Sequence, residues 1–129
     1  MKDIGISVVI TAYNRKEFLA DAINSVIYQT TEGFSCEIIV VSNFTFDVSS
    51  LESNYEIRTV LMSGTIGEFL YVGLLTSKYE IVAFLDDDDT FEKGKLLRLA
   101  ETFSANPELC YYHNDLKYVD AHMCSIKWH

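Results

Sequence analysis

Residues 81–90 read IVAFLDDDDT, five apolar residues followed directly by four aspartates. A short apolar run that contains β-branched and aromatic residues is typical of a strand buried in a sheet. Because a charged carboxylate is expensive to bury, we expect the aspartates just beyond the buried strand and not inside the core. This stretch therefore predicts a strand over residues 81–85 that ends at an acidic edge of the sheet.

Similar apolar runs recur on both sides of this stretch and alternate with segments of helical periodicity. Strands are expected over 6–11, 37–41, 57–62, 81–85 and 109–113. Helices are expected from a cap at Asn14 to about 27, over 67–77 and over 93–104, with a short helix beyond the loop 42–50 and a hairpin of 116–120 with 125–128. This alternation predicts the α/β class, a three-layer α/β/α domain with an open, mainly parallel sheet between helices.

Composition is consistent with one domain over residues 1–129. The chain is 49% hydrophobic, contains a single proline and carries a net charge of −9, which disfavours a nucleic-acid partner held by its phosphates. No apolar run approaches the ~18 residues that a membrane span needs, and the N-terminus does not resemble a signal peptide. The three cysteines form no CxxC pair. We therefore expect a cytoplasmic protein with no transmembrane segment.

In open parallel sheets, ligands bind outside the carboxyl ends of the strands. That rule predicts that residues 11–15, 42–43 and 86–89 share one edge. Neighbouring carboxylates raise one another's pKa unless a cation offsets their charge, and oxygen ligands suit Mg²⁺ or Mn²⁺. We expect Asp86 and Asp88 to bind such an ion. On the residues alone, Asp87 is more simply explained as solvated and Asp89 as a cap of the following helix.

Three segments together resemble the N-terminal half of family 2 glycosyltransferases. ISVVITAYNR, EIIVVSN and GLLTSKYEIVAFLDDDD are similar to the family's usual SVVIPTYNR, EIIVVDDGS and GLxxAxGEYIAFLDxDD, and the resemblance covers about residues 5–105. It implies a Rossmann-like domain of the nucleotide-diphospho-sugar transferase type. It also implies Mn²⁺- or Mg²⁺-dependent transfer of a sugar from a nucleotide-diphosphate sugar to an acceptor hydroxyl, with inversion.

The resemblance also implies site residues. Asp86 and Asp88 would form an Asp-x-Asp motif that holds the metal, and Tyr13 would pack near the base. The implied nucleotide-sugar-binding residues are Thr11, Tyr13, Arg15, Ser42, Asn43, Asp86 and Asp87. Two positions depart from the family pattern: Ser42 replaces an aspartate that reads the base, and Leu70 replaces a basic residue near the phosphates. Arg15 is then the nearest candidate for a phosphate contact, or a surface charge at the helix start.

The implied partners are a UDP- or GDP-sugar donor and a carbohydrate or glycolipid acceptor, as in polysaccharide biosynthesis, with a cytoplasmic location that extends to the periphery of the inner membrane face. The acceptor-binding half of the family is missing from these 129 residues, so the general base is expected beyond His129. The chain is then either a shortened form of a longer protein or an incomplete homologue.

Two other functions are compatible with the residues. The chain could be a donor-binding module that is inactive on its own. Alternatively, IVAFLDDDDT fits the Asp-x-Asp-x-Thr pattern of Mg²⁺-dependent phosphatases of the haloacid dehalogenase type, with Asp86 as nucleophile and Asp88 as acid and base. That motif usually opens its domain, whereas here it follows the fourth expected strand.

Overall fold

The computed structural model describes residues 4–29, 33–113 and 119. In these residues, strands and helices follow one another in the order β1 (Gly5–Ala12), α1 (Leu19–Ile27), β2 (Ser35–Ser42), β3 (Glu56–Leu61), α2 (Ile66–Thr76), β4 (Ile81–Asp86) and α3 (Lys95–Ala105). The strands form one sheet in the order β3-β2-β1-β4, and each neighbouring pair is parallel. The predicted α/β class and parallel sheet are confirmed.

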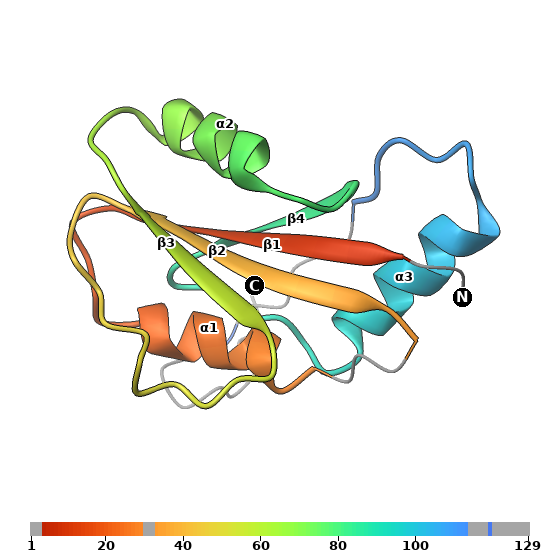
Figure 1. Cartoon of the computed structure of the whole chain (residues 1–129), viewed down its shortest axis with the longest axis horizontal. Helices are drawn as coiled ribbons and strands as arrows, with labels where there is room; N and C mark the ends of the chain where they lie inside the picture. Colours follow the sequence, from red (N-terminus) through yellow and green to blue (C-terminus); the bar gives the residue numbers. More distant parts are fainter. Residues whose placement is uncertain (1–3, 30–32, 114–118, 120–129) are drawn as a thin grey trace, which may run out of the picture.

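The sheet lies between two helical layers, with α2 on one side and α1 and α3 on the other (Figure 1). Successive side chains of a strand point to opposite faces, so β1 contributes to two cores. Ile6, Val8 and Ile10 pack with α1 and α3, whereas Val9 packs with Phe69 of α2. Because β1 and β2 are covered on both faces, their sequences are almost continuously apolar.

Gly73 allows α2 to lie very close to β1. A Cβ atom at this position would lie 2.3 Å from Cγ1 of Val9, which is much closer than van der Waals contact. Phe69, one turn earlier on α2, is fully buried in the core on this face. The glycine therefore sets the distance between the helix and the strand, and with it the position of the start of α2 over the edge of the sheet.

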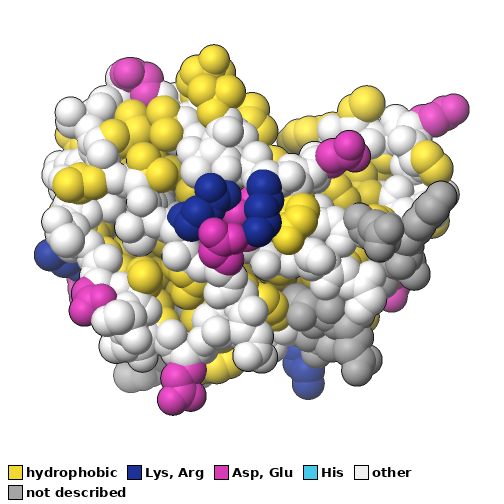
Figure 2. Space-filling model, in the orientation of Figure 1, with side chains coloured by type: hydrophobic (Ala, Val, Ile, Leu, Met, Phe, Trp, Pro, Cys, Tyr) yellow, Lys and Arg dark blue, Asp and Glu magenta, His cyan; other side chains and the backbone are white. Residues whose placement is uncertain are grey.

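A buried carboxylate joins the sheet to the end of α2. Glu37 of β2 is fully buried and accepts hydrogen bonds from Ser7 Oγ (2.6 Å) and from the backbone N–H of Lys78 (2.7 Å). Its other oxygen pairs with Arg58, which also donates to the carbonyl of Thr76 (2.9 Å). Burial alone would raise the pKa of Glu37, but the hydrogen bonds from Lys78, Ser7 and Arg58 outweigh burial and lower it. Figure 2 shows basic and acidic side chains next to one another near the centre of the view, with a hydrophobic side chain beside them.

Several expected boundaries differ from the structure. Asn14 does not cap a helix: its backbone is left-handed (φ 57°), and α1 begins at Leu19 after Phe18. The short helix expected beyond residue 50 is only a turn, in which Leu51 N–H bonds to the carbonyl of Val48 (3.1 Å). α3 begins at Lys95, two residues after the expected start.

The strand predicted over 109–113 is not present. The segment begins in a turn, where Leu109 N–H bonds to the Asn106 carbonyl (2.9 Å), and the Tyr111 side chain is 73% exposed beside His113. An apolar run forms a strand only where a neighbouring strand pairs with it. The hairpin expected over 116–120 and 125–128 lies outside the described residues, with the exception of residue 119.

Among the described parts of the chain, no helix has both the length and the apolar character needed to cross a membrane.

Replacing Glu37 by Gln is predicted to destabilise the domain by about 3 kcal/mol, because it leaves the Arg58 guanidinium without its buried counter-charge. Urea unfolding followed by circular dichroism measures the change. Glu80→Gln is the control, because Glu80 is exposed and its replacement should change the free energy of unfolding by less than about 0.5 kcal/mol. Equal stability of the two variants would contradict a structural role for the buried network.

Candidate functional site

The register of the sheet brings the three expected polar segments to one edge. Thr11 of β1 lies opposite both Val41 of β2 and Asp86 of β4, and Ala12 lies opposite Ser42. The chain leaves β1 toward β2 on one side, while β4 lies on the other side, so the β1–β4 boundary is a topological switch point. Ligands of open α/β sheets bind at such a point. We call residues 86–89, which begin at this point, the acidic rim.

Arg15 forms a two-point ion pair with Asp87 across the switch point. Its Nε donates to Asp87 Oδ2 (2.8 Å) and its Nη2 to Asp87 Oδ1 (3.0 Å), while Nη2 also lies 3.2 Å from Asp88 Oδ2. The hydrogen bonds and charge of Asp87, followed by those of Asp88, raise the pKa of Arg15. Asp87 is buried, and its backbone N–H donates to the Thr11 carbonyl (3.1 Å). The expectation that Asp87 is solvated was wrong, because Arg15 neutralises it inside the edge of the sheet.

The other three aspartates of the rim have carboxylate oxygens that lie close to one another. Asp86, Asp88 and Asp89 are exposed, and one carboxylate oxygen from each lies within 4.8 Å of the others. Partial burial, followed by the charges of the neighbouring aspartates, raises the pKa of Asp86 and of Asp89, and Arg15 offsets only part of this effect. Three hard oxygen donors at this spacing suit Mg²⁺ or Mn²⁺. The donor set therefore fits the divalent ion that the sequence predicts.

The structure adds Asp89 to this group. Sequence reasoning interpreted Asp89 as a helix cap, but α3 begins only at Lys95 and its N-terminal cap is Gly94, with no side-chain hydrogen bond. Instead, Asp89 N–H bonds to the Asp86 carbonyl (3.1 Å) in a tight turn, which brings the fourth aspartate back beside the first. A turn directly after the strand was the missing signal, since Asp is a common turn residue.

Ser42 and Asn43 also lie at this edge, but their polar groups face the protein. Ser42 Oγ donates to the carbonyl of Phe44 (2.7 Å). Asn43 Oδ1 accepts from Asn14 N–H (2.8 Å), and Asn43 Nδ2 donates to Asn14 Oδ1 (2.7 Å). The reciprocal amide pair holds the loops after β1 and β2 together and accounts for the left-handed backbone of Asn14, a conformation that Asn tolerates better than most residues.

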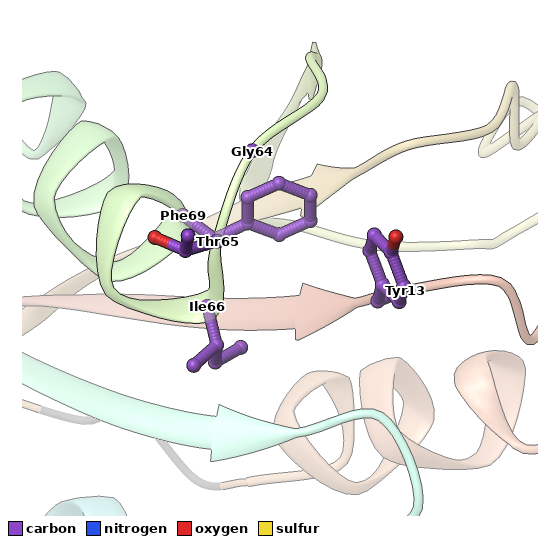
Figure 3. Close-up of a pocket in the computed structure, with 5 residues that line it drawn as sticks. All are labelled: Tyr13, Gly64, Thr65, Ile66 and Phe69. Carbon is purple, nitrogen blue, oxygen red and sulfur yellow. The ribbon is translucent and has the colours of Figure 1, made fainter.

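Tyr13 borders a small pocket between the end of β1 and the start of α2. The pocket has a volume of about 290 Å³ and is lined by Tyr13, Gly64, Thr65, Ile66 and Phe69 (Figure 3). The Tyr13 ring is 54% exposed and meets Phe69 edge-on, with 6.0 Å between ring centroids. We call this cavity the Tyr13 pocket. Sequence reasoning identified Tyr13 but missed the α2 residues, although the capping box of Thr65 and Glu68 marks the helix start in the sequence.

Comparisons with known proteins agree on one family. The profile described as "Glycosyl transferase family 2" matches residues 7–120. Uncharacterized glycosyltransferases of Haemophilus influenzae and Nostoc sp. are 29% and 32% identical to this chain over 116 and 118 residues, which cover 87% and 84% of this chain. The same matches cover only 39% and 36% of those two proteins, so the chain spans less than half of their length.

Solved structures show the same fold. The crystal structure of S. aureus TarS 1-349 has a TM-score of 0.64 and 24% identity, covering 81% of this chain and 33% of that one. Structures of the same TarS segment in complex with UDP-GlcNAc and with UDP match with the same TM-score. This likeness supports the three-layer fold of the nucleotide-sugar transferase type.

Replacing Arg15 by Gln is predicted to destabilise the protein more than Arg98→Gln, which removes the same charge from an exposed position on α3. The reason is that Asp87 would keep its charge in a buried position without a cation. The double variant Arg15→Gln with Asp87→Asn should recover much of the loss, because both charges are then absent. Urea unfolding of the wild type, of the single variants Arg15→Gln and Asp87→Asn and of the double variant measures the coupling, and strictly additive effects would show that the two residues do not act together.

Asp89→Asn is predicted to raise the melting temperature of the metal-free protein at pH 7. The pKa of Asp89 is raised in the folded state, so ionised Asp89 opposes folding near neutral pH, and this opposition is lost as the pH falls through the raised pKa. The gain should therefore shrink as the pH approaches 3.8, the ordinary aspartate value. Thermal unfolding in EDTA tests this, with Glu101→Gln on the exposed side of α3 as the control; an unchanged or lower melting temperature at pH 7 would contradict it.

Proposed function

The chain belongs to glycosyl transferase family 2, and from this membership we propose that the acidic rim and the Tyr13 pocket form the donor-binding site of a sugar-transferring enzyme. One observation carries the proposal: Thr11, two residues before Tyr13, is paired with Asp86 in the sheet, so the Tyr13 pocket and the acidic rim begin from neighbouring strand ends. A nucleotide-diphosphate sugar needs both an apolar place for its base and a charged place for its diphosphate. TarS, which has the same fold, binds UDP-GlcNAc and UDP, and this supports a donor of the same class.

The proposed roles follow from the position of each side chain. Tyr13 packs against the base, and Thr11 holds the β1 end beside Asp86. Asp86, Asp88 and Asp89 would hold Mn²⁺ or Mg²⁺, which would offset the negative charge that develops on the departing diphosphate. Arg15 neutralises Asp87 and keeps it out of this group, and Ser42 and Asn43 shape the neighbouring loop.

We propose that the reaction is transfer to an acceptor hydroxyl with inversion. In such a displacement, a base within hydrogen-bonding reach must remove the proton of the acceptor. The relatives are more than twice as long as the part of them that this chain matches. We therefore propose that the acceptor site and the base belong to the part of the enzyme outside residues 1–129. A carbohydrate or glycolipid acceptor, and with it a place at the membrane surface, remains a prediction.

Donor binding without turnover is a second candidate. Ser42 stands where the family usually has an acidic residue, and its hydroxyl donates to the Phe44 carbonyl, so this position lacks the charged acceptor that the family usually offers to the base. The two candidates differ in one result: release of sugar from a bound donor, to water or to an acceptor, would exclude the binding module. The family match argues against the phosphatase alternative.

Binding of UDP or GDP is predicted to require a divalent ion and Asp88. Calorimetric titration in Mn²⁺ should give a measurable affinity for at least one diphosphate, and Asp88→Asn should weaken it by at least about tenfold, because one of three oxygen donors loses its charge. Asp21→Asn, an exposed change in the first turn of α1, removes the same charge as a control. Binding of equal strength in Mn²⁺ and in EDTA would contradict the metal role, and no binding of any diphosphate would contradict the donor site.

A further inference from the structure

The geometry points to a donor site that takes the nucleobase by ring packing and size, and not by side-chain hydrogen bonds. The Tyr13 pocket would then accept bases with opposite hydrogen-bonding edges with similar affinity. This inference rests on the proposed function and concerns the substrate class of the same site. It goes beyond the family resemblance, which implies a side chain that reads the base.

The residues that line the Tyr13 pocket offer no side chain of fixed polarity. Among the described residues, the lining consists of Tyr13, Gly64, Thr65, Ile66 and Phe69, with no carboxylate, amide or guanidinium. The two polar side chains in this set are hydroxyls, and a hydroxyl can either donate or accept a hydrogen bond. Such groups can bond to any base edge and therefore distinguish poorly between bases.

The polar side chains next to the pocket are engaged within the protein. Thr65 Oγ1 accepts from Glu68 N–H (3.2 Å), and Glu68 Oε1 accepts from Thr65 N–H (3.1 Å), so the Glu68 carboxylate is part of the cap of α2. Ser42 donates to the carbonyl of Phe44, and Asn43 is paired at both ends with Asn14. A hydrogen bond between a base and Ser42 or Asn43 would therefore compete with these bonds.

The apolar part of the pocket favours packing against a flat ring. Figure 3 shows Tyr13 across the pocket from Phe69 and Ile66. The side chains of Tyr13 and Ile66 are 54% and 58% exposed, so both present surface that a ligand can cover. Stacking of a base on an aromatic ring tolerates any base, because every base has a π-face. The volume of about 290 Å³ is near the lower end for small-molecule pockets and suits one ring system.

The two kinds of recognition differ enough in their selectivity to be separated by experiment. A site built to hydrogen-bond its substrate rejects an analogue that lacks the group by about 10⁴- to 10⁵-fold, whereas apolar pockets discriminate by about 10- to 200-fold, mainly through size. Uracil and cytosine have the same size but opposite groups at position 4, and guanine and adenine differ in the same way at position 6. The comparison of UDP with CDP therefore removes size from the result, whereas guanine also carries a 2-amino group that adenine lacks, so the comparison of GDP with ADP includes a difference in size.

The test is calorimetric titration of the full chain with UDP, CDP, GDP and ADP in Mn²⁺. We expect the UDP to CDP ratio to be less than about tenfold, and the GDP to ADP ratio to stay within the roughly 200-fold that a difference in size can produce in an apolar pocket. A ratio above its limit in either pair would overturn the inference while leaving the donor site in place. If none of the four diphosphates binds, the proposed function itself fails, and the inference fails with it.

Variants separate ring packing from hydrogen bonding. Tyr13→Ala should weaken all binding diphosphates by a similar factor, roughly 5- to 150-fold, whereas Tyr13→Phe should keep both ratios. Tyr28→Ala is the matched control, because Tyr28 is 78% exposed at the far end of α1. Ser42→Ala should leave the UDP to CDP ratio unchanged. A loss confined to one base, in either Tyr13→Ala or Ser42→Ala, would show that side chains read the base and would overturn the inference.

Discussion

The two-point ion pair between Arg15 and Asp87 determines what the acidic rim can do. Four consecutive aspartates at the end of one strand repel one another unless a cation offsets their charge. Arg15, from the loop after β1, holds Asp87 in a buried position and also lies near Asp88. Asp86, Asp88 and Asp89 each keep one carboxylate oxygen within 4.8 Å of the others. The same ion pair joins the loop after β1 to the turn after β4. One interaction therefore links the two strand ends and neutralises one of the four aspartates.

The remaining three carboxylates are tolerated because they lie at the edge of the sheet and not in its core. Partial burial, followed by their mutual repulsion, raises the pKa of Asp86 and Asp89, and a divalent ion would offset the repulsion. The Tyr13 pocket is mainly apolar, and no charged side chain is among the described residues that line it. The site therefore combines a charged half that suits a diphosphate with an apolar half that suits a ring, which is the division a nucleotide-sugar donor requires.

The sequence predicted well those features that depend on nearest neighbours in the chain. The apolar runs predicted β1, β2, β3 and β4, and the rule for parallel sheets correctly predicted that residues 11–15, 42–43 and 86–89 meet. Prediction from the sequence failed where the structure depends on contacts between residues that are distant in the chain. Arg15 and Asp87 are 72 positions apart, so nothing local distinguishes Asp87 from its neighbours. The strand expected over 109–113 failed for the same reason, because the sequence cannot show whether a pairing partner exists.

The central claim is that the rim binds a divalent ion through Asp86, Asp88 and Asp89, while Asp87 stays bonded to Arg15. Crystals of the protein soaked in MnCl₂ and UDP, with diffraction recorded above and below the manganese absorption edge, test it most directly. The account predicts one anomalous peak in contact with Asp88 and with Asp86 or Asp89, while Asp87 remains bonded to Arg15. No manganese at the rim, or manganese bound by Asp87 after Arg15 has moved away, would contradict it.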